Sequence, residues 1–484
     1  MSTTSSDDTV FISGNFNVLH AGHIRLFAFA RNFGKKLVVG VISDSQAGHA
    51  AYVEQSLRLE AVRTNSWVST AFLVDEPLET VLRRLKPKAV IKGREFEQQN
   101  NIESSILHEW DGRLIYGSSE LPLSSIDMMR RELAAEWSEF RLPELYLNTH
   151  NITGDSLRSA VTNFCGLNVC VVGDLIVDEY ISCESLGMSQ EDPSLVVTPL
   201  DKRRFLGGAG IVAAHAAGLG ATASLITVTG SDACGEFAKQ ILDTYQVSCC
   251  PIIDDSRPTT LKQRYRADGK TLLRVSHLVQ NSISPTLQEA VYHQYIDCLE
   301  KADLVVFSDF NYGCLPNNLI NRLIAAAAAA EREVICVADS QCSSQVGDVS
   351  RFRDMSLISA TEREVRISLR DNDDGLTVIA ERLRNRAKAK HVMMKLGSDG
   401  VLVHTKGPDG RTMTNQFPAL NHSPIDVAGA GDSMLIAAGL TLATGASLWE
   451  ATVIGSVASA LQVAKLGNQP ISQTEFLAAL HPFK

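Results

Sequence analysis

Two histidines three residues apart, His20 and His23, follow a short apolar run and a glycine turn near the start of the chain. In a helix, residues at i and i+3 share one face, so the two imidazoles can converge on one ligand. The free N–H groups of the same helix start attract anions. The pattern is typical of phosphoryl or nucleotidyl transfer, although two ordinary histidines beside a turn would have the same spacing.

A second candidate site lies near the C-terminus, where Gly429, Ala430, Gly431 and Asp432 precede an apolar helical pattern. Small residues let the backbone approach an anion, and the helix start offers it unpaired N–H groups. Asp432 could take the proton of a substrate hydroxyl that attacks a γ-phosphate. The alternative is a plain capping aspartate after a glycine turn.

The elements that must position these residues alternate between short β-rich runs and helical patterns, twice along the chain. In the first alternation we expect strands at 10–12, 37–42, 71–74, 89–91 and 113–116. A polar interval follows at 141–154, after which Asp155 is expected to cap a short helix and a strand at 168–172 begins the second alternation. We therefore expect two doubly wound α/β domains, residues 1–142 and 167–484, with a linker and lead-in helix at 143–166.

Length and composition are consistent with this division. The 484 residues suggest about three domains, or two of which one is large. The net charge of -10 disfavours binding to nucleic acid or to an anionic membrane. No apolar run is long enough to span a bilayer, and residues 1–10 are polar and acidic, so we expect no signal peptide there. All 10 cysteines lie between Cys165 and Cys342, and we expect reduced thiols in a cytoplasm rather than a disulfide framework.

The first motif resembles a family signature. Residues 14–23, Gly-Asn-Phe-Asn-Val-Leu-His-Ala-Gly-His, are similar to the G-x-F-D-x-L-H-x-G-H of nucleotidyltransferases such as cytidylyltransferases and heptose 1-phosphate adenylyltransferases. The resemblance implies a Rossmann-like domain in which His20 and His23 are catalytic. It also implies a set of nucleotide-binding residues: Gly14, Asn17, Lys92, Gly93, Ser124, Ser125 and Arg130.

Two departures from that family are visible. Asn17 stands where aspartate is usual, although asparagine can still accept a hydrogen bond. The loop at 45–55 lacks the lysine that relatives place near the triphosphate. The donor nucleotide, ATP or CTP, therefore stays open.

The second motif, Asp-Val-Ala-Gly-Ala-Gly-Asp at 426–432, resembles the signature of ribokinase-like, or PfkB, sugar kinases. The resemblance implies a ribokinase-like α/β domain with a small β lid at 259–274, which carries Lys262, Arg264 and Arg266. It implies that Asp432 is the catalytic base. For the anion hole and ATP it implies Gly429, Ala430, Gly431, Lys395, Gly397 and Gly400; for the sugar Asp174, Asp178, Gly207, Gly208 and Lys262; and for Mg²⁺, through water, Glu364.

Four kinase positions depart from the family pattern: Ile211 for asparagine, Tyr312 and Gln341 for lysine, and Thr361 for the asparagine of N-x-x-E. They suggest a changed sugar or a weakened kinase. The alternative is a kinase-like domain that only binds a sugar phosphate or regulates. A dinucleotide motif at 208–213 is disfavoured, because a basic segment rather than a buried strand precedes it.

The two resemblances together match bifunctional heptose 7-phosphate kinases and heptose 1-phosphate adenylyltransferases, in which the kinase normally comes first; here the order is reversed. They imply a cytoplasmic enzyme of nucleotide-sugar synthesis that uses Mg²⁺, with ATP as phosphoryl donor and ATP or CTP as nucleotidyl donor. Its partners would be sugar phosphates and nucleoside triphosphates, not nucleic acid or a membrane. We also expect a homodimer through the kinase lid.

Overall fold

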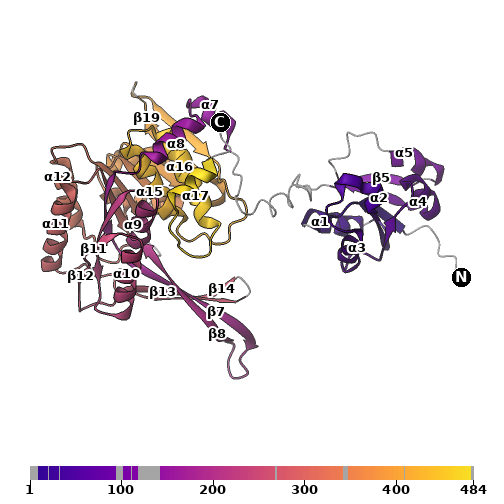
Figure 1. The fold of residues 1–484 in the computed structure, drawn as a ribbon, viewed down its shortest axis with the longest axis horizontal. Coiled ribbons are helices and arrows are strands. Elements are labelled where there is room, and N and C mark those ends of the chain that lie inside the picture. Colours follow the sequence, from indigo (N-terminus) through magenta and orange to yellow (C-terminus); the bar gives the residue numbers. More distant parts are fainter. Residues whose placement is uncertain are drawn as a thin grey trace. The chain divides into compact units, whose positions relative to one another are not determined.

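The computed structural model describes residues 9–19, 21–31, 33–93, 102–110, 112–117, 142–267, 270–341, 347–407 and 409–480. The chain forms two compact units, Met1–Ser138 and Glu139–Lys484, drawn in Figure 1.

The first unit is built on a parallel sheet in the order β3-β2-β1-β4-β5. Successive strand residues face opposite sides, so Val10 and Ile12 of β1 pack with α1 and α3, whereas Phe11 packs with α4 and α5. The five strands expected from the sequence are confirmed. The elements are β1 (Thr9–Gly14), α1 (Ala21–Ala30), β2 (Lys36–Ile42), α2 (Asp44–Ala47), η2 (Gly48–Ala50), α3 (Gln55–Arg63), β3 (Thr70–Val74), α4 (Leu78–Leu85), β4 (Ala89–Gly93), α5 (Ile102–Leu107), η4 (His108–Trp110) and β5 (Arg113–Gly117).

The second unit is built on a nine-stranded sheet in the order β11-β9-β6-β15-β16-β17-β18-β19-β20, parallel except where β19 and β20 join. Val169 and Val171 of β6 face α8, α9, α15 and α16, and Cys170 and Val172 face α11, α12 and α14. The nine strands are β6 (Asn168–Gly173), β9 (Thr222–Ile226), β11 (Ser248–Cys249), β15 (Leu304–Asp309), β16 (Ile335–Ser340), β17 (Leu357–Thr361), β18 (His391–Lys395), β19 (Val401–Lys406) and β20 (Thr412–Phe417). Two short strands, β10 (Val228–Thr229) and β12 (Ile252–Ile253), pair with each other in a separate sheet.

Helices cover both faces of this sheet. They are α7 (Glu144–Thr149), α8 (Gly154–Thr162), α9 (Ala209–Gly218), α10 (Ala233–Thr244), α11 (Pro285–Leu299), α12 (Asn317–Ala328), η5 (Val349–Arg351), α13 (Glu362–Leu369), α14 (Leu376–Ala387), η6 (Gly397–Asp399), α15 (Ala430–Ala443), α16 (Leu448–Val463) and α17 (Gln473–Leu480). None of the helices in the described ranges has the length and apolar content needed to cross a bilayer. The described cysteines are all free thiols.

A separate sheet forms the lid, in the order β14-β13-β7-β8, and its strands extend from the second unit in Figure 1. The strands are β7 (Leu175–Met188), β8 (Leu195–Gly208), β13 (Thr260–Ala267) and β14 (Lys270–His277). The small β lid expected at 259–274 corresponds to β13 and the start of β14. The sequence did not predict β7 and β8, because both strands leave the body of the unit and expose much of their length.

The segment at 143–166, expected as a linker and lead-in helix, contributes α7 and α8 to the second unit. Tyr146, Leu157 and Phe164 lie in its main apolar cluster. The cap of α8 differs from the prediction. Thr153, not Asp155, caps the helix, and its side chain accepts a hydrogen bond from the backbone N–H of Ser156 in a capping box.

Candidate active sites

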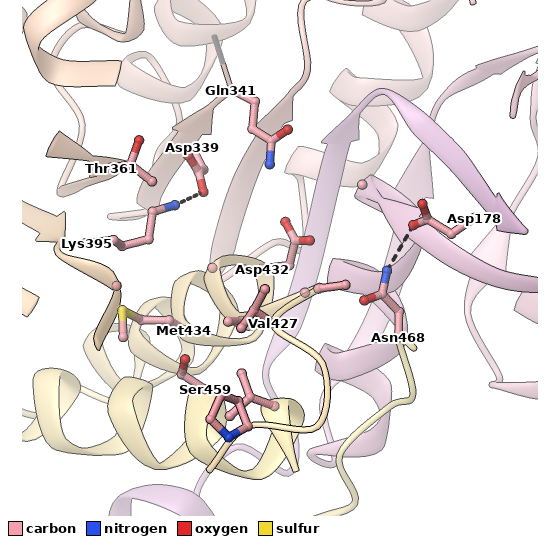
Figure 2. A pocket seen from close by; sticks show the side chains of 18 of the residues that line it. Asp178, Asp339, Gln341, Thr361, Lys395, Val427, Asp432, Met434, Ser459 and Asn468 are labelled. Atoms are coloured by element: carbon pink, nitrogen blue, oxygen red, sulfur yellow. Dashed lines mark hydrogen bonds and ion pairs between the residues drawn. The ribbon is translucent and has the colours of Figure 1, made fainter. Parts of the chain in front are cut away.

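A cavity of about 790 Å³ lies in the second unit between the sheet ends, the lid and the start of α15. Figure 2 shows Asp432 between two pairs of side chains, Lys395 with Asp339 and Asp178 with Asn468. Helix α16 adds Ser456, Ser459 and Val463 to the wall.

Most kinase residues expected from the sequence meet in this cavity. Its lining includes Asp178, Gly208, Lys262, Glu364, Lys395, Gly397, Gly400, Gly429, Ala430, Gly431 and Asp432. Asp174 and Gly207 are not part of that lining. These residues lie between positions 178 and 432 of the sequence, and folding brings them to one cavity.

The candidate phosphate-binding turn, residues 426–431, ends at the start of α15. Gly429 precedes the helix with φ +74°, a left-handed conformation that favours glycine. Its carbonyl accepts the N–H of Ser433 at 2.9 Å, and the N–H of Ala430 makes a long hydrogen bond of 3.5 Å to Val427 O. The N–H groups of Gly431 and Asp432, which follow in the first turn of α15, can be offered to an anion. Withdrawal from water and the charge of Asp339 raise the pKa of Asp432 to about 7, which suits a proton acceptor at neutral pH.

Lys395 brings a positive charge to the same turn. Its ammonium forms an ion pair with Asp339, a carboxyl group whose pKa burial raises to about 6. Burial opposes the charge of Lys395, but Asp339 and Glu364 raise its pKa above the ordinary value. A Cβ built on Gly431 would lie 3.0 Å from Lys395 Nζ, so the missing side chain of Gly431 makes room for this ammonium.

Glu364 and Thr361 form the capping box of α13. Glu364 Oε2 accepts the N–H of Thr361 at 2.7 Å, and Thr361 Oγ1 accepts the N–H of Glu364 at 3.3 Å. Both residues line the cavity, and the nearby Asp339 Oδ1 is buried with no hydrogen-bond partner. Carboxylate oxygens of this kind fit Mg²⁺, which usually needs only one or two of them beside substrate phosphates. In the described ranges no three His, Cys, Asp or Glu side chains form a metal-binding group.

On the side of Asp432 opposite Lys395, Asp178 is held by two partners. Its Oδ1 forms an ion pair with Arg264 of the lid, and its Oδ2 accepts from Asn468 Nδ2 at 3.2 Å. A side chain on Gly207 would collide with Asp178 Oδ2, so Gly207 serves the site by leaving space. Asn468 follows α16 in a loop without a recognisable motif, and sequence analysis missed it.

Asp174 supports a loop and does not face the cavity. Its carboxylate accepts backbone N–H groups of Phe310, Tyr312 and Cys314 at 2.8, 3.2 and 3.2 Å. Burial and the nearby Asp309 raise its pKa to about 6, although these hydrogen bonds oppose the rise. The loop places the rings of Phe310 and Tyr312 with their centroids 4.9 and 5.1 Å from Lys262 Nζ.

The four departures from the kinase pattern fall in two groups. Tyr312, Gln341 and Thr361 line the cavity. Ile211 does not, because it lies in α9 and is buried in the main apolar cluster. Position 211 therefore offers no amide to the cavity, whereas Asn468 presents an amide to it from another element.

In the first unit, the described residues of the histidine motif lie at or just after the carboxyl end of β1, beside the strand-order reversal where such sheets bind ligands. Asn17 Nδ2 donates to Ala50 O at 2.9 Å, and Asn17 Oδ1 accepts the N–H of Tyr52 at 2.9 Å. Asn17 thus holds the loop that lacks the family's lysine. His23 in α1 packs edge-on to Phe16, with ring centroids 5.2 Å apart.

Lys92 and Gly93 end the neighbouring strand β4, at the same edge as Gly14. Lys92 Nζ lies 2.6 Å from Oε1 of Glu103, a buried partner that sequence analysis missed. The remaining transferase predictions, His20, Ser124, Ser125 and Arg130, lie outside the described residues.

The second unit combines a mostly parallel α/β sheet, a β lid and a glycine turn followed by an aspartate, which together define a sugar-kinase fold. The chain belongs to the pfkB family of carbohydrate kinases, whose description matches residues 167–475. Residues 11–129 match the cytidylyltransferase-like family. The two-domain α/β fold and the reversed order expected from the sequence are thereby confirmed.

Individual relatives and solved structures show the same similarity to carbohydrate kinases and to bifunctional proteins. The "Bifunctional protein HldE" of Caulobacter vibrioides is 31% identical over 331 residues, 67% of this chain and 65% of that protein. The protein of the same name from Desulfatibacillum aliphaticivorans is 28% identical over 325 residues, 66% of this chain and 64% of that protein. The chain thus spans 64–65% of the length of these relatives. The structure of Escherichia coli phosphofructokinase-2 in complex with substrates and products has a TM-score of 0.53 at 19% identity, covering 65% of this chain and 99% of that one, which shows the shared fold.

Proposed function

We propose that the chain is a bifunctional enzyme of nucleotide-sugar synthesis that works in the cytoplasm. The second unit would phosphorylate a sugar or sugar phosphate of the heptose phosphate type with ATP. The first would transfer a nucleotidyl group from ATP or CTP to a sugar 1-phosphate and release pyrophosphate. The observation that carries the proposal is the meeting of Asp432, the glycine turn, Lys395 and Asp178 in one cavity.

In the kinase reaction, Asp432 takes the proton of the acceptor hydroxyl as its oxygen attacks the γ-phosphorus of ATP. The bond from that phosphorus to the β–γ bridging oxygen breaks, and ADP leaves. The N–H groups at the start of α15 and the Lys395 ammonium stabilise the negative charge on the transferred phosphoryl group. Asp178 and Lys262 line the acceptor side.

Mg²⁺ is expected at the nucleotide side, where it would neutralise phosphate charge when bound. Glu364 would hold it, directly or through water, because this carboxylate lines the cavity and keeps Oε1 available after Oε2 caps Thr361. Asp339 lies near the same nucleotide side of the cavity, because its charge, like that of Glu364, raises the pKa of Lys395.

In the transferase reaction, a phosphate oxygen of the sugar 1-phosphate attacks the α-phosphorus of the nucleoside triphosphate. His20 and His23 would stabilise the charge that develops there, with Gly14, Lys92 and Gly93 at the adjoining strand ends. The family resemblance assigns the triphosphate to Ser124, Ser125 and Arg130.

The lid supports a further part of the proposal, a homodimer. Its strands expose large apolar side chains, which a second copy of the lid would cover: Leu186, Met188, Leu195, Val196 and Leu200. Analytical ultracentrifugation of the wild type and of a Leu186→Glu, Leu200→Glu variant would test this. A wild-type monomer at micromolar concentration contradicts it.

The enzymatic proposal is tested with reciprocal variants. Asp432→Asn should abolish transfer of γ-labelled phosphate to sugar phosphates while sparing pyrophosphate release with sugar 1-phosphates, and His23→Ala should do the opposite. Each variant is the folding control for the other. The proposal fails if the wild type performs neither reaction across heptose, pentose and hexose phosphates with ATP and CTP.

The alternative function, a kinase-like unit that only binds or regulates, rests on Gln341, Tyr312 and Thr361 in the cavity lining. It predicts an active transferase and measurable sugar-phosphate binding by the second unit without phosphoryl transfer. The same panel of acceptors separates it from the bifunctional enzyme.

A further inference from the structure

A hydroxyl of the lid contacts the phosphate-binding turn from outside the cavity. Tyr180 lies in β7, and its Oη donates to Asp426 Oδ2 at 2.7 Å. Neither residue belongs to the cavity lining. Tyr180 is buried, and its ring lies edge-on to Phe205 with centroids 5.2 Å apart. Burial leaves this hydroxyl few other partners, so the bond to Asp426 is costly to lose.

Asp426 in turn shapes the backbone that leads to Gly429. Its Oδ1 accepts the N–H of Ala428 at 3.1 Å, and its Oδ2 accepts the N–H of Gly467 at 3.1 Å. Gln462 Nε2 donates to the carbonyl groups of the same two residues, at 3.2 and 3.0 Å. The turn is therefore fixed by side-chain hydrogen bonds, and one carboxylate makes three of them.

The ring of Tyr180 also contacts the cations of the lid. The guanidinium carbons of Arg264 and Arg266 lie 5.2 and 5.3 Å from its centroid, within cation–π range. Arg264 forms the ion pair with Asp178 on the acceptor side. One side chain thus contacts the acceptor-side cations with its ring and the phosphate-side turn with its hydroxyl.

We propose that Tyr180 is a positioning residue for phosphoryl transfer: its hydroxyl holds Asp426, and through Asp426 it holds the turn that meets the transferred phosphate. The inference rests on the kinase activity proposed above. A catalytic group displaced by ~1 Å can lose roughly a hundredfold in rate. Loss of one hydrogen bond at the base of the turn should lower the rate by less than a hundredfold, because the hydrogen bonds of Gln462 still support the turn.

The test compares Tyr180→Phe with Tyr295→Phe in the full chain. The first variant removes only the hydroxyl and keeps the ring. The second removes another buried tyrosine hydroxyl. Tyr295 lies in α11, and its hydroxyl has no hydrogen-bond partner among the described residues. We expect Tyr180→Phe to lower kcat on the order of tenfold, equivalent to ~1.4 kcal/mol in the barrier. KM for ATP and for the sugar phosphate should stay within about twofold, and Tyr295→Phe should match the wild type.

Asp426→Ala, which removes every acceptor at this position, and the double variant decide whether Tyr180 acts through Asp426. If it does, adding Tyr180→Phe to Asp426→Ala lowers kcat no further. Additive losses, an unchanged kcat in Tyr180→Phe, or a rise in KM alone would each overturn the inference. An inactive wild type would refute the proposed kinase and the inference with it, whereas an active wild type matched by Tyr180→Phe refutes the inference alone.

Discussion

Phosphoryl transfer should depend on the ionisation of Asp432, and Asp339 should set the pH at which the rate falls. Four charged groups act on Asp432: Asp339, Lys395, Asp178 and Lys262. Its pKa of about 7 means that about one molecule in eleven holds an ionised Asp432 at pH 6, so kcat there should be about a tenth of its plateau. The rate rises with pH because the base must lose its proton first.

Asp339→Asn removes one negative charge near Asp432 and should therefore lower the pKa of that carboxyl. The variant should have a lower plateau than the wild type, because Lys395 loses its ion-pair partner. The informative quantity is therefore kcat at pH 6 divided by the variant's own plateau. This ratio should rise from about a tenth toward one. Initial rates with γ-labelled ATP between pH 5 and 9 measure it, with both substrates saturating. An acid limb that stays in place in Asp339→Asn refutes the electrostatic argument.

Three further substitutions test separate contacts. Gly431→Ala should leave the unfolding temperature nearly unchanged but lower kcat roughly tenfold, because its methyl group displaces Lys395 Nζ from the turn; calorimetry and initial rates report the two effects. Lys262→Met should raise KM by about tenfold for phosphorylated acceptors and little for neutral sugars, as a charge contact requires; equal changes for both classes contradict that role. Asn17→Ala loses both the donor to Ala50 O and the acceptor of the Tyr52 N–H, at a cost of about 1–3 kcal/mol. Hydrogen exchange at the Tyr52 amide should then quicken, and an unaltered rate there would show that the Asn17 side chain does not hold the loop.

The sequence predicted the parts of the fold whose pattern is local. Buried strands such as β1 and β6 alternate with amphipathic helices, and the Asp426–Asp432 motif marks its own turn and helix start. These predictions are confirmed by the sheet order and by the family match.

Other features depend on contacts across the fold, which spacing does not record. Asp174 was expected to face the sugar, yet its carboxylate binds three backbone N–H groups of a loop more than 130 residues away. Asn468 reaches Asp178 across 290 positions in a loop without a motif. The sequence predicted Asp155 as the cap of α8, whereas Thr153 has the extended backbone of a cap and accepts the N–H of Ser156. Threonine and aspartate are both capping residue types, so residue type alone does not fix the helix start.

Two walls of the cavity, the start of α15 and the lid, differ in local stability. Helix α15 is buried continuously from Ser433 to Thr441, between the sheet and α16, whereas most residues of β14, the lid strand that adds Arg274 and Ser276 to the cavity lining, are exposed. Segments with few buried contacts open at a lower free energy than core helices. Local opening therefore releases the β14 part of the lid while Asp432 and its turn remain in place.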